Sequence, residues 1–237
     1  ISKMSYKPAT HVLFDMDGLL LNTEDLYTIG FEKIAAKYGK EFTYGLKCKI
    51  MGKQSKELAQ TIIDELELPL TVDEFIAESR KVFHELFPQS KVMEGAKRLL
   101  EHLKKNNIPF GLATSSSQES YEMKAKHHED IFNMFEYKTW GSSDPEVKRG
   151  KPYPDVFLVA ADKFPEKPEP VKCLVFEDSV NGVRAARAAG MQVVMVPDSK
   201  LDRTQTLDAT LVIDSLSQFE PEQFGLPPFS DASGRSF

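Results

Sequence analysis

The sequence contains little cysteine, since Cys48 and Cys173 are the only two among its 237 residues. Two cysteines cannot form the multi-disulfide framework of a small secreted domain, so we expect a reduced, cytoplasmic protein. Glycine and proline number only 13 and 14, which excludes collagen-like and low-complexity chains. No apolar run approaches the roughly 20 residues that a membrane-spanning helix needs, so we expect no membrane contact.

An excess of positive charge is also lacking. Lys and Arg total 30 against 36 Asp and Glu, which gives a formal net charge of −6. Nucleic-acid phosphates are bound by clustered basic side chains, so we expect no nucleic-acid partner. The remaining composition, 41% hydrophobic and 28% charged, is that of an ordinary globular protein. The length allows one large domain, or one domain with a small companion.

Strand-like and helix-like segments alternate through most of the chain. Short apolar runs predict strands at 11–15, 108–114, 135–140, 172–176, 191–196 and 210–213. Helical spacing of apolar residues predicts helices at 95–106, 118–128, 154–164 and 180–189. This alternation is typical of βαβ units, and we therefore predict an α/β fold with a Rossmann-like parallel sheet.

A helical block of about 60 residues interrupts the alternation after the first strand. Between residues 24 and 87 the apolar residues recur at helical spacing, and no strand pattern is evident. We predict a core domain of residues 6–22 and 90–226, with a small all-helical cap, 23–89, inserted after the first strand. A cap that emerges there would stand over a site at the carboxyl ends of the strands. For residues 227–237, rich in proline and small polar residues, we predict a disordered tail.

Polar side chains follow four of the predicted strands, at or soon after the point where each strand ends. They are Asp15, Asp17, Thr114, Lys151, Glu177 and Asp178. Because the carboxyl ends of parallel strands meet at one edge of the sheet, we expect these side chains to converge. Several carboxylates without a histidine or cysteine cluster favour Mg²⁺ over Zn²⁺.

Such a set is suited to phosphoryl transfer. A metal beside a hydroxyl and a lysine can hold a phosphate. One carboxylate can attack phosphorus, and a second, two residues further on, can serve as general acid and then as base. Each piece alone is ordinary, since an Asp-x-Asp is usually a turn or a helix cap. Their order, their spacing and the strand before each of them together predict one catalytic site.

These motifs resemble those of the haloacid dehalogenase-like superfamily. Residues 12–18 (VLFDMDG) resemble its first motif, 112–115 (LATS) its second, 151–155 (KPYPD) its third and 176–190 its fourth. The helical block is similar to the small type I cap of the β-phosphoglucomutase-like subgroup. The resemblance covers about residues 10–226. It implies a monomeric phosphatase that acts on a small-molecule phosphate ester.

The resemblance also implies roles for the residues of the core motifs. Asp15 would be the nucleophile, and Asp17 the general acid and base. Thr114 would hydrogen-bond the phosphoryl group, and Lys151 would neutralise the charge on the nucleophile and on the phosphoryl oxygens.

Metal and substrate ligands are implied in the same way. Mg²⁺ would be held by Asp15, Asp17 through its backbone carbonyl, Asp178, and Glu177 either directly or through water. The substrate-binding residues would be Ser115, Ser116 and the cap-loop residues Gly52, Lys53 and Gln54.

The resemblance implies pseudouridine 5′-phosphate as the substrate, with glycerol 3-phosphate as the alternative. Two positions depart from the family pattern: Asn22 stands near the cap hinge where an aspartate is frequent, and Tyr27 stands where mutases carry a histidine. Without that histidine, hydrolysis is favoured over a sugar phosphomutase reaction. A phospho-acceptor signalling domain would also use an Asp, a Thr or Ser and a Lys, but Asp17 and the helical block argue against it.

Overall fold

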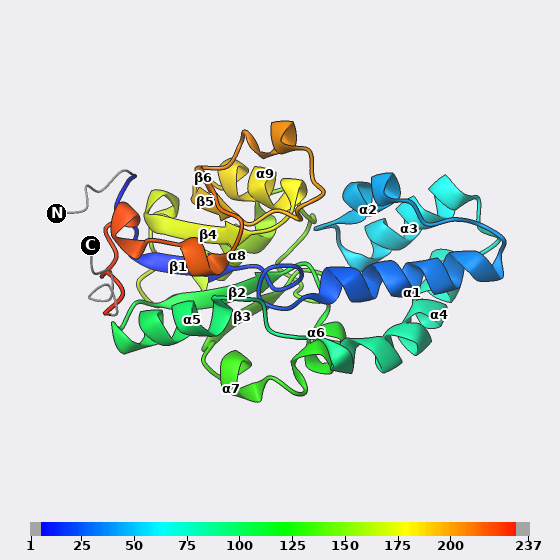
Figure 1. The fold of residues 1–237 in the computed structure, drawn as a ribbon, viewed down its shortest axis with the longest axis horizontal. Helices are drawn as coiled ribbons and strands as arrows, with labels where there is room; N and C mark the ends of the chain where they lie inside the picture. Colours follow the sequence, from blue (N-terminus) through cyan, green and yellow to red (C-terminus); the bar gives the residue numbers. More distant parts are fainter. Residues whose placement is uncertain (1–5, 231–237) are drawn as a thin grey trace, which may run out of the picture.

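The computed structural model describes residues 6–230, and a six-stranded parallel sheet lies at its centre (Figure 1). The strands are β1 (His11–Phe14), β2 (Phe110–Thr114), β3 (Tyr137–Trp140), β4 (Cys173–Glu177), β5 (Gln192–Met195) and β6 (Leu211–Val212). Their order in the sheet is β3-β2-β1-β4-β5-β6. The predicted α/β fold with a Rossmann-like parallel sheet is confirmed.

The first strand occupies the centre of the sheet and sets the register of its neighbours. Phe14 pairs with Leu112 of β2 and with Phe176 of β4, so the carboxyl ends of these three strands lie side by side. All four residues of β1 are buried, as expected for a parallel strand covered on both faces. The residues that follow β1, β2 and β4 therefore lie at the same edge of the sheet.

Helices cover both faces of the sheet. The helices α5 (Ala96–Lys105), α6 (Gln118–Ala125) and α7 (Glu129–Phe132) share one hydrophobic cluster with Val12 and Phe14. On the opposite face α8 (Asp155–Asp162) and α9 (Val180–Ala188) pack with Leu13. This alternation along β1 follows from the period of two residues in a strand. The short helix α7 was not predicted, because four residues are too few to show a helical period.

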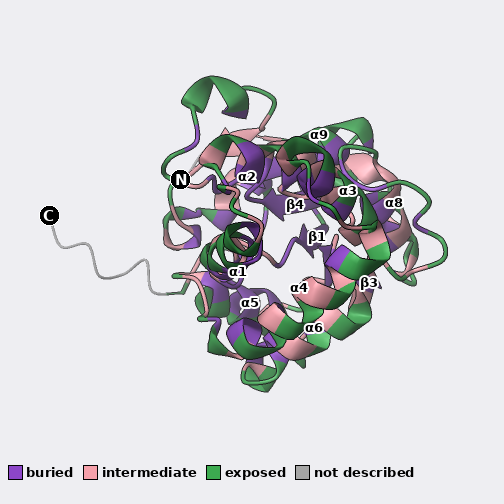
Figure 2. Ribbon diagram, turned by 90° about the vertical axis from the view of Figure 1, so that its right-hand side faces the viewer, coloured by how far each residue is buried: buried purple, intermediate pink, exposed green. Residues whose placement is uncertain are grey.

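The insertion after β1 consists of four helices with a core of their own. They are α1 (Thr23–Lys37), α2 (Tyr44–Ile50), α3 (Ser55–Leu66) and α4 (Val72–Leu86), and the turn η1 (Phe87–Gln89) continues α4. A separate hydrophobic cluster, which includes Phe31, Phe75 and Phe83, joins these helices. Figure 1 shows them together at the right, beyond the ends of the strands. Figure 2, viewed from that side, shows exposed residues on their outer faces. The predicted all-helical insertion is confirmed.

The chain enters and leaves this helical unit through two segments that pair with each other. The Asn22 amide donates to the Lys91 carbonyl at 2.9 Å, and the Lys91 amide donates to Asn22 Oδ1 at 2.6 Å. The Met93 amide also donates to the Leu20 carbonyl at 2.9 Å. The helical unit is thus attached to the sheet through a hydrogen-bonded double connection.

Residues 227–230, part of the predicted tail, lie against α5. The Pro227 carbonyl is 2.8 Å from His102 Nε2, and the Phe229 ring lies 4.4 Å from the His102 ring between centroids. Residues 231–237 lie outside the described part of the chain. Among the helices in residues 6–230, none combines the length and the apolar character that crossing a membrane would require.

Candidate active site

The sheet brings the predicted catalytic side chains together. Asp15 and Asp17 follow β1, Thr114 ends β2, and Glu177 ends β4 directly before Asp178. The remaining member, Lys151, reaches this edge from the loop before α8, and its ammonium group contacts the carboxylates of Asp15 and Glu177. This convergence follows from the adjacent carboxyl ends of β1, β2 and β4.

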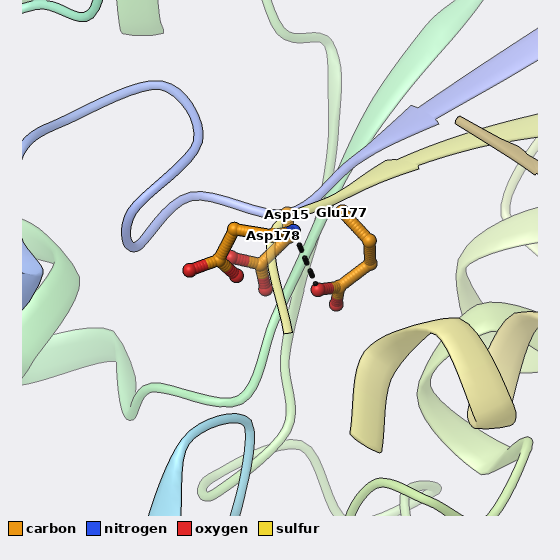
Figure 3. A group of neighbouring side chains, drawn as sticks. All are labelled: Asp15, Glu177 and Asp178. Carbon is orange, nitrogen blue, oxygen red and sulfur yellow. Dashed lines mark hydrogen bonds between the residues drawn. The ribbon is translucent and has the colours of Figure 1, made fainter. Parts of the chain in front are cut away.

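Three buried carboxylates form a compact acidic group, drawn in Figure 3. One ligand atom from each of Asp15, Glu177 and Asp178 lies within 4.8 Å of the others. Burial raises the pKa of Asp15 to about 7. Burial, together with repulsion from Glu177 and Glu24, raises the pKa of Asp178 well above its ordinary value. Crowded buried carboxylates of this kind are relieved by a cation, and an all-oxygen donor set suits a hard divalent ion.

Gly18, in the backbone before the cap, lies directly against the Asp178 carboxylate. Gly18 has a φ of +75°, and a Cβ there would stand 2.1 Å from a carboxylate oxygen of Asp178. Only glycine tolerates both the left-handed backbone and this close approach. The glycine of the first motif therefore brings the chain after Asp17 against Asp178.

Lys151 is fully buried and is held by two carboxylates. Its Nζ donates to Asp15 Oδ1 at 2.5 Å and to Glu177 Oε1 at 2.6 Å. The other oxygen of Glu177 accepts the amides of Asp178 and Ser179, each at 3.0 Å. Because both Glu177 oxygens are already occupied by donors, this side chain is fixed and in turn fixes Lys151.

Asp17 accepts hydrogen bonds on both of its carboxylate oxygens. Its Oδ1 receives the Thr23 hydroxyl and the Lys124 ammonium, both at 2.6 Å. Its Oδ2 receives the hydroxyls of Ser116 at 2.9 Å and of Thr114 at 3.5 Å. Burial would raise the pKa of Asp17, but the Lys124 charge and these hydrogen bonds outweigh it and lower that pKa.

Lys124, a buried residue of α6, is absent from the predicted site. Burial would lower the pKa of its ammonium group, but the charge of Asp17 outweighs this and raises it. The sequence carries one signal for it, since Lys124 lies three residues after buried Tyr121 and directly before buried Ala125. A lysine on the apolar stripe of a helix must find a buried partner, but its position alone does not identify that partner.

The cap loop, residues 51–54, is hydrogen-bonded to the core. The Gly52 carbonyl accepts the Ser115 hydroxyl at 2.7 Å. The Met51 carbonyl accepts the Asn181 side-chain amide at 2.8 Å, and Gln54 Nε2 donates to the Gly141 carbonyl at 2.5 Å. These bonds hold the cap loop against the core.

The loop residues expected to bind substrate differ in where they point. Gly52 and Lys53 line the cavity above Asp15, together with Ser115 and Ser116. The Lys53 ammonium lies 2.9 Å from Glu57, within the cap. Gln54 lines a neighbouring cavity instead.

Two adjoining cavities lie between the cap and the core. The first, about 60 Å³, contains Asp15, Asp17 and Asp178 in its wall. The second, about 320 Å³, lies between α3 and α4 of the cap and α6 of the core. Both are bordered by Tyr27, Phe31, Ser55 and Leu58. A space of roughly 60 Å³ holds a few water molecules, so a phosphate ester needs the second cavity or an opened cap.

Known proteins share this organisation. A family model described as haloacid dehalogenase-like hydrolase matches residues 12–196. A probable pseudouridine-5′-phosphatase of Drosophila melanogaster is 50% identical over 225 residues, covering 95% of this chain and 97% of that protein. A mitochondrial (DL)-glycerol-3-phosphatase of Arabidopsis thaliana is 46% identical over 226 residues, covering 94% and 76% respectively.

A solved structure agrees with these sequence relationships. The crystal structure of a putative β-phosphoglucomutase from Thermotoga maritima superposes with a TM-score of 0.65 at 30% sequence identity, covering 90% of this chain and 95% of that one. The family model reaches from the first strand through β5, and it therefore spans the strand ends that carry the acidic group. The chain belongs to the haloacid dehalogenase-like hydrolases, and it is a phosphatase of that family.

Proposed function

We propose that this phosphatase hydrolyses pseudouridine 5′-phosphate, with Asp15 as the nucleophile. The observation that carries the proposal is the convergence of Asp15, Asp17 and Lys151 under a closed helical cap. In the first step an Asp15 oxygen bonds to phosphorus while the ester P–O bond breaks, and Asp17 gives the leaving oxygen the proton that it took from water in the preceding turnover. In the second step water attacks phosphorus, Asp17 takes its proton, and Asp15 is released together with inorganic phosphate.

Lys151 and Thr114 would stabilise charge during these steps. Lys151 Nζ already lies 2.5 Å from the Asp15 carboxylate, so its positive charge favours the ionised nucleophile and then the phosphoryl oxygens. The Thr114 hydroxyl at the end of β2 can donate to a phosphoryl oxygen. Phosphoryl transfer depends chiefly on such positioning and charge stabilisation.

We propose Mg²⁺ as the cofactor, held by Asp15, Asp178 and the Asp17 backbone carbonyl. The ion, when bound, supplies charge neutralisation and orients the phosphoryl group. Hard oxygen donors and the raised pKa values of Asp15 and Asp178 support this assignment. Both Glu177 oxygens already accept hydrogen bonds, so we propose that Glu177 contributes by holding Lys151 rather than as a direct ligand.

Residues 23–89 would act as a cap that opens to admit substrate and closes over it. The Ser115 hydroxyl and Gly52 carbonyl pair is one of the contacts that would form on closure. Closure removes bulk water from the phosphoryl group and strengthens the electrostatic interactions within the site. Residues 6–22 and 90–226 would form the catalytic core beneath this cap.

The second cavity supports a nucleoside as the leaving group. Its volume of about 320 Å³ falls at the small end of the range for ligand pockets, roughly 300–1,000 Å³. Aromatic side chains of the cap, including Phe75 and Phe83, line it together with polar groups of α6 such as Ser120. A ribose and a flat base extending past Tyr27 would find both stacking surfaces and hydrogen-bonding groups there.

Glycerol 3-phosphate is the alternative substrate. Two (DL)-glycerol-3-phosphatases of Arabidopsis thaliana are 46% and 45% identical to this chain. Glycerol is much smaller than a nucleoside, so it would leave most of the second cavity unused.

A mutase reaction is disfavoured by the residue at position 27. The Tyr27 hydroxyl accepts a hydrogen bond from Lys124 at 2.8 Å, and burial raises the pKa of this phenol. A neutral phenol held in this way is a poor base for a sugar hydroxyl.

We also propose that the enzyme acts as a monomer. The exposed large apolar side chains among residues 6–230 are Ile29, Tyr153, Leu158 and Leu207, and they are spread over α1, the region of α8 and the segment after η3 (Arg203–Thr206). Scattered side chains of this kind are normal on a monomer surface. Sedimentation analysis should give the mass of one chain.

The decisive experiment compares kcat/KM with Mg²⁺ for pseudouridine 5′-phosphate, uridine 5′-phosphate and glycerol 3-phosphate. Asp15→Asn serves as the blank. A preference of about 100-fold for pseudouridine 5′-phosphate, roughly 2.7 kcal/mol in the transition state, supports the proposal. A comparable preference for glycerol 3-phosphate assigns the alternative substrate, and no hydrolysis of any phosphate ester overturns both.

A further inference from the structure

The buried ammonium group of Lys124 lies at the centre of a cluster that links the cap to the catalytic carboxylate. Its Nζ donates to Asp17 Oδ1 at 2.6 Å, to Ser116 Oγ at 2.8 Å and to the Tyr27 hydroxyl at 2.8 Å. The side chain of Lys124 is 0% exposed. Burying an unpaired ammonium costs several kcal/mol, so these three oxygen acceptors account for its place in the interior.

Two aromatic rings, one from helix α1 and one from the turn η1, also pack against the Lys124 ammonium group. Lys124 Nζ lies 4.8 Å from the centroid of the Tyr27 ring and 4.7 Å from that of the Phe87 ring. Both distances are within the range of a cation–π interaction. The two rings also contact each other edge to face, with centroids 5.0 Å apart. Lys124 therefore contacts α1 and η1 of the helical insertion, as well as the core.

Lys124 has no direct access to substrate. The wall of the catalytic cavity includes Asp17, Tyr27 and Ser116 but not Lys124. Any effect of Lys124 on the reaction must therefore pass through the residues it holds, and among these only Asp17 takes part in the proposed proton transfers.

The donors around Asp17 determine which way its carboxylate faces. Thr23 and Lys124 share Oδ1, while Ser116 occupies Oδ2. Thr23 belongs to the first turn of α1, whereas Lys124 and Ser116 belong to the core. Since Tyr27 is one turn further along α1, a movement of that helix displaces a partner of Asp17 and a partner of Lys124 together.

We propose that Lys124 is a positioning residue that orients Asp17 for proton transfer, and that Tyr27 couples this orientation to closure of the cap. The inference rests on the proposed phosphatase reaction. When the cap is closed, the Tyr27 hydroxyl completes the set of acceptors that holds the ammonium group against Asp17. When the cap opens, that acceptor is withdrawn and Asp17 loses its fixed orientation.

This role makes a prediction about leaving groups. While the Asp15–phosphorus bond forms and the ester P–O bond breaks, an alkoxide leaving group needs the proton of Asp17. p-Nitrophenolate is a stable anion and departs without one. Displacing Asp17 should therefore slow the transfer from an alkyl phosphate much more than the transfer from p-nitrophenyl phosphate.

The test is Lys124→Met, with Lys126→Met as the matched control, because Lys126 is exposed at the end of the same helix. Phosphoenzyme formation is measured in single-turnover experiments with p-nitrophenyl phosphate and with the better alkyl substrate of the wild type. For Lys124→Met we expect a loss on the order of 100-fold for the alkyl substrate and a loss below about tenfold for p-nitrophenyl phosphate. Lys126→Met should behave as the wild type with both.

Tyr27→Phe gives an independent test of the coupling. It keeps the aromatic ring but removes the acceptor of Lys124, so it should slow the alkyl substrate several-fold while retaining the wild-type melting temperature. It also carries the test if Lys124→Met does not fold. Equal losses on both substrates, or no loss on either, would overturn the inference while leaving the phosphatase assignment intact. A wild type inactive on every phosphate ester would instead overturn the proposed function, and the inference with it.

Discussion

Lys151 Nζ lies 2.6 Å from Glu177 Oε1, and neither side chain is exposed to solvent. Glu177 is the last residue of β4, and its second oxygen is held by the amides of the next two residues. A buried ion pair fixed by the backbone in this way has little freedom to move. It therefore defines where the lysine stands relative to Asp15, which is the third member of the arrangement.

Glu177→Gln tests this relationship with a nearly isosteric change. The amide cannot supply the negative charge that holds Lys151, so the lysine should shift further toward Asp15 and mask the nucleophile. We expect kcat to fall by about 10–100-fold, as for other residues that orient a catalytic ligand. Steady-state kinetics measures this, with Glu146→Gln as an exposed control. A Glu177→Gln enzyme with wild-type kcat would show that the pair has no catalytic role.

Gly182→Ala tests how tightly α9 packs on the same carboxylate. A Cβ at Gly182 would stand 1.9 Å from the carboxylate carbon of Glu177, whereas one at Gly45 would meet only Thr43 Oγ1 at 3.8 Å. Both glycines lie in helices, so the two variants differ mainly in this clash. We expect Gly182→Ala to lower the free energy of unfolding by about 1–3 kcal/mol. Gly45→Ala should be neutral or stabilising, because alanine is the better helix former.

Urea denaturation of the two alanine variants decides this prediction. If Gly182→Ala unfolds at the same urea concentration as the wild type, with an unchanged slope, the approach of α9 to Glu177 is looser than the structure indicates.

The strands and the site residues that end them were predictable, because each depends on local sequence. An apolar run followed by Asp15 or by Glu177 marks both a buried strand and its polar end. Since the strands are parallel, no further information was needed to expect these ends at one edge. The helical insertion was predictable for the same reason, since its apolar spacing differs from that of the strands.

Contacts between segments far apart in the chain were not predictable from sequence. Lys124 and Asp17 are 107 positions apart, and they meet only because α6 docks beside the entry to α1. Likewise, the Ser115 hydroxyl contacts the Gly52 carbonyl of the cap loop, a pairing that depends on how the cap closes. Local patterns carry no information on such docking, so the sequence could indicate only that a lysine lies on the buried face of its helix.

Metal-free protein should lose stability as the pH rises from about 4 toward 7. Burial raises the pKa values of Asp15 and Glu24 to about 7 in the folded state, so over this interval the folded chain binds more protons than the unfolded one. Stability then falls with rising pH. The lowered pKa of Asp17 acts in the opposite sense, but only below its ordinary value of 3.8.

Mg²⁺ should reverse this loss, because it replaces the protons on Asp15 and Asp178. We expect 10 mM Mg²⁺ to raise the melting temperature more at pH 7.5 than at pH 5. This concentration is about 100 times a dissociation constant on the order of 0.1 mM, for which binding contributes roughly 2.7 kcal/mol to the free energy of unfolding. Differential scanning calorimetry with and without chelator measures both curves. An equal effect of Mg²⁺ at the two pH values would argue that the ion binds away from these carboxylates.

Asn22 offers a final test, of the double connection between cap and core. Its Oδ1 accepts the Lys91 amide at 2.6 Å. Asn22→Ala removes the acceptor, which for one hydrogen bond costs about 0.5–1.5 kcal/mol. We expect kcat and KM to change together by about 2–10-fold, because residues at a hinge affect both closure and release.

Asn22→Asp distinguishes the hydrogen bond from the side chain itself. A carboxylate can accept the same Lys91 amide, so this variant should retain kinetics close to those of the wild type. The control is Asn133→Ala, at an exposed asparagine after α7, which should leave kcat and KM unchanged. If the alanine variant matches the wild type while the aspartate variant does not, the charge at this position matters and the amide contact does not. A charge at position 22 would then affect the hinge electrostatically. The opposite pattern shows that the hydrogen-bond acceptor matters and that either side chain can supply it.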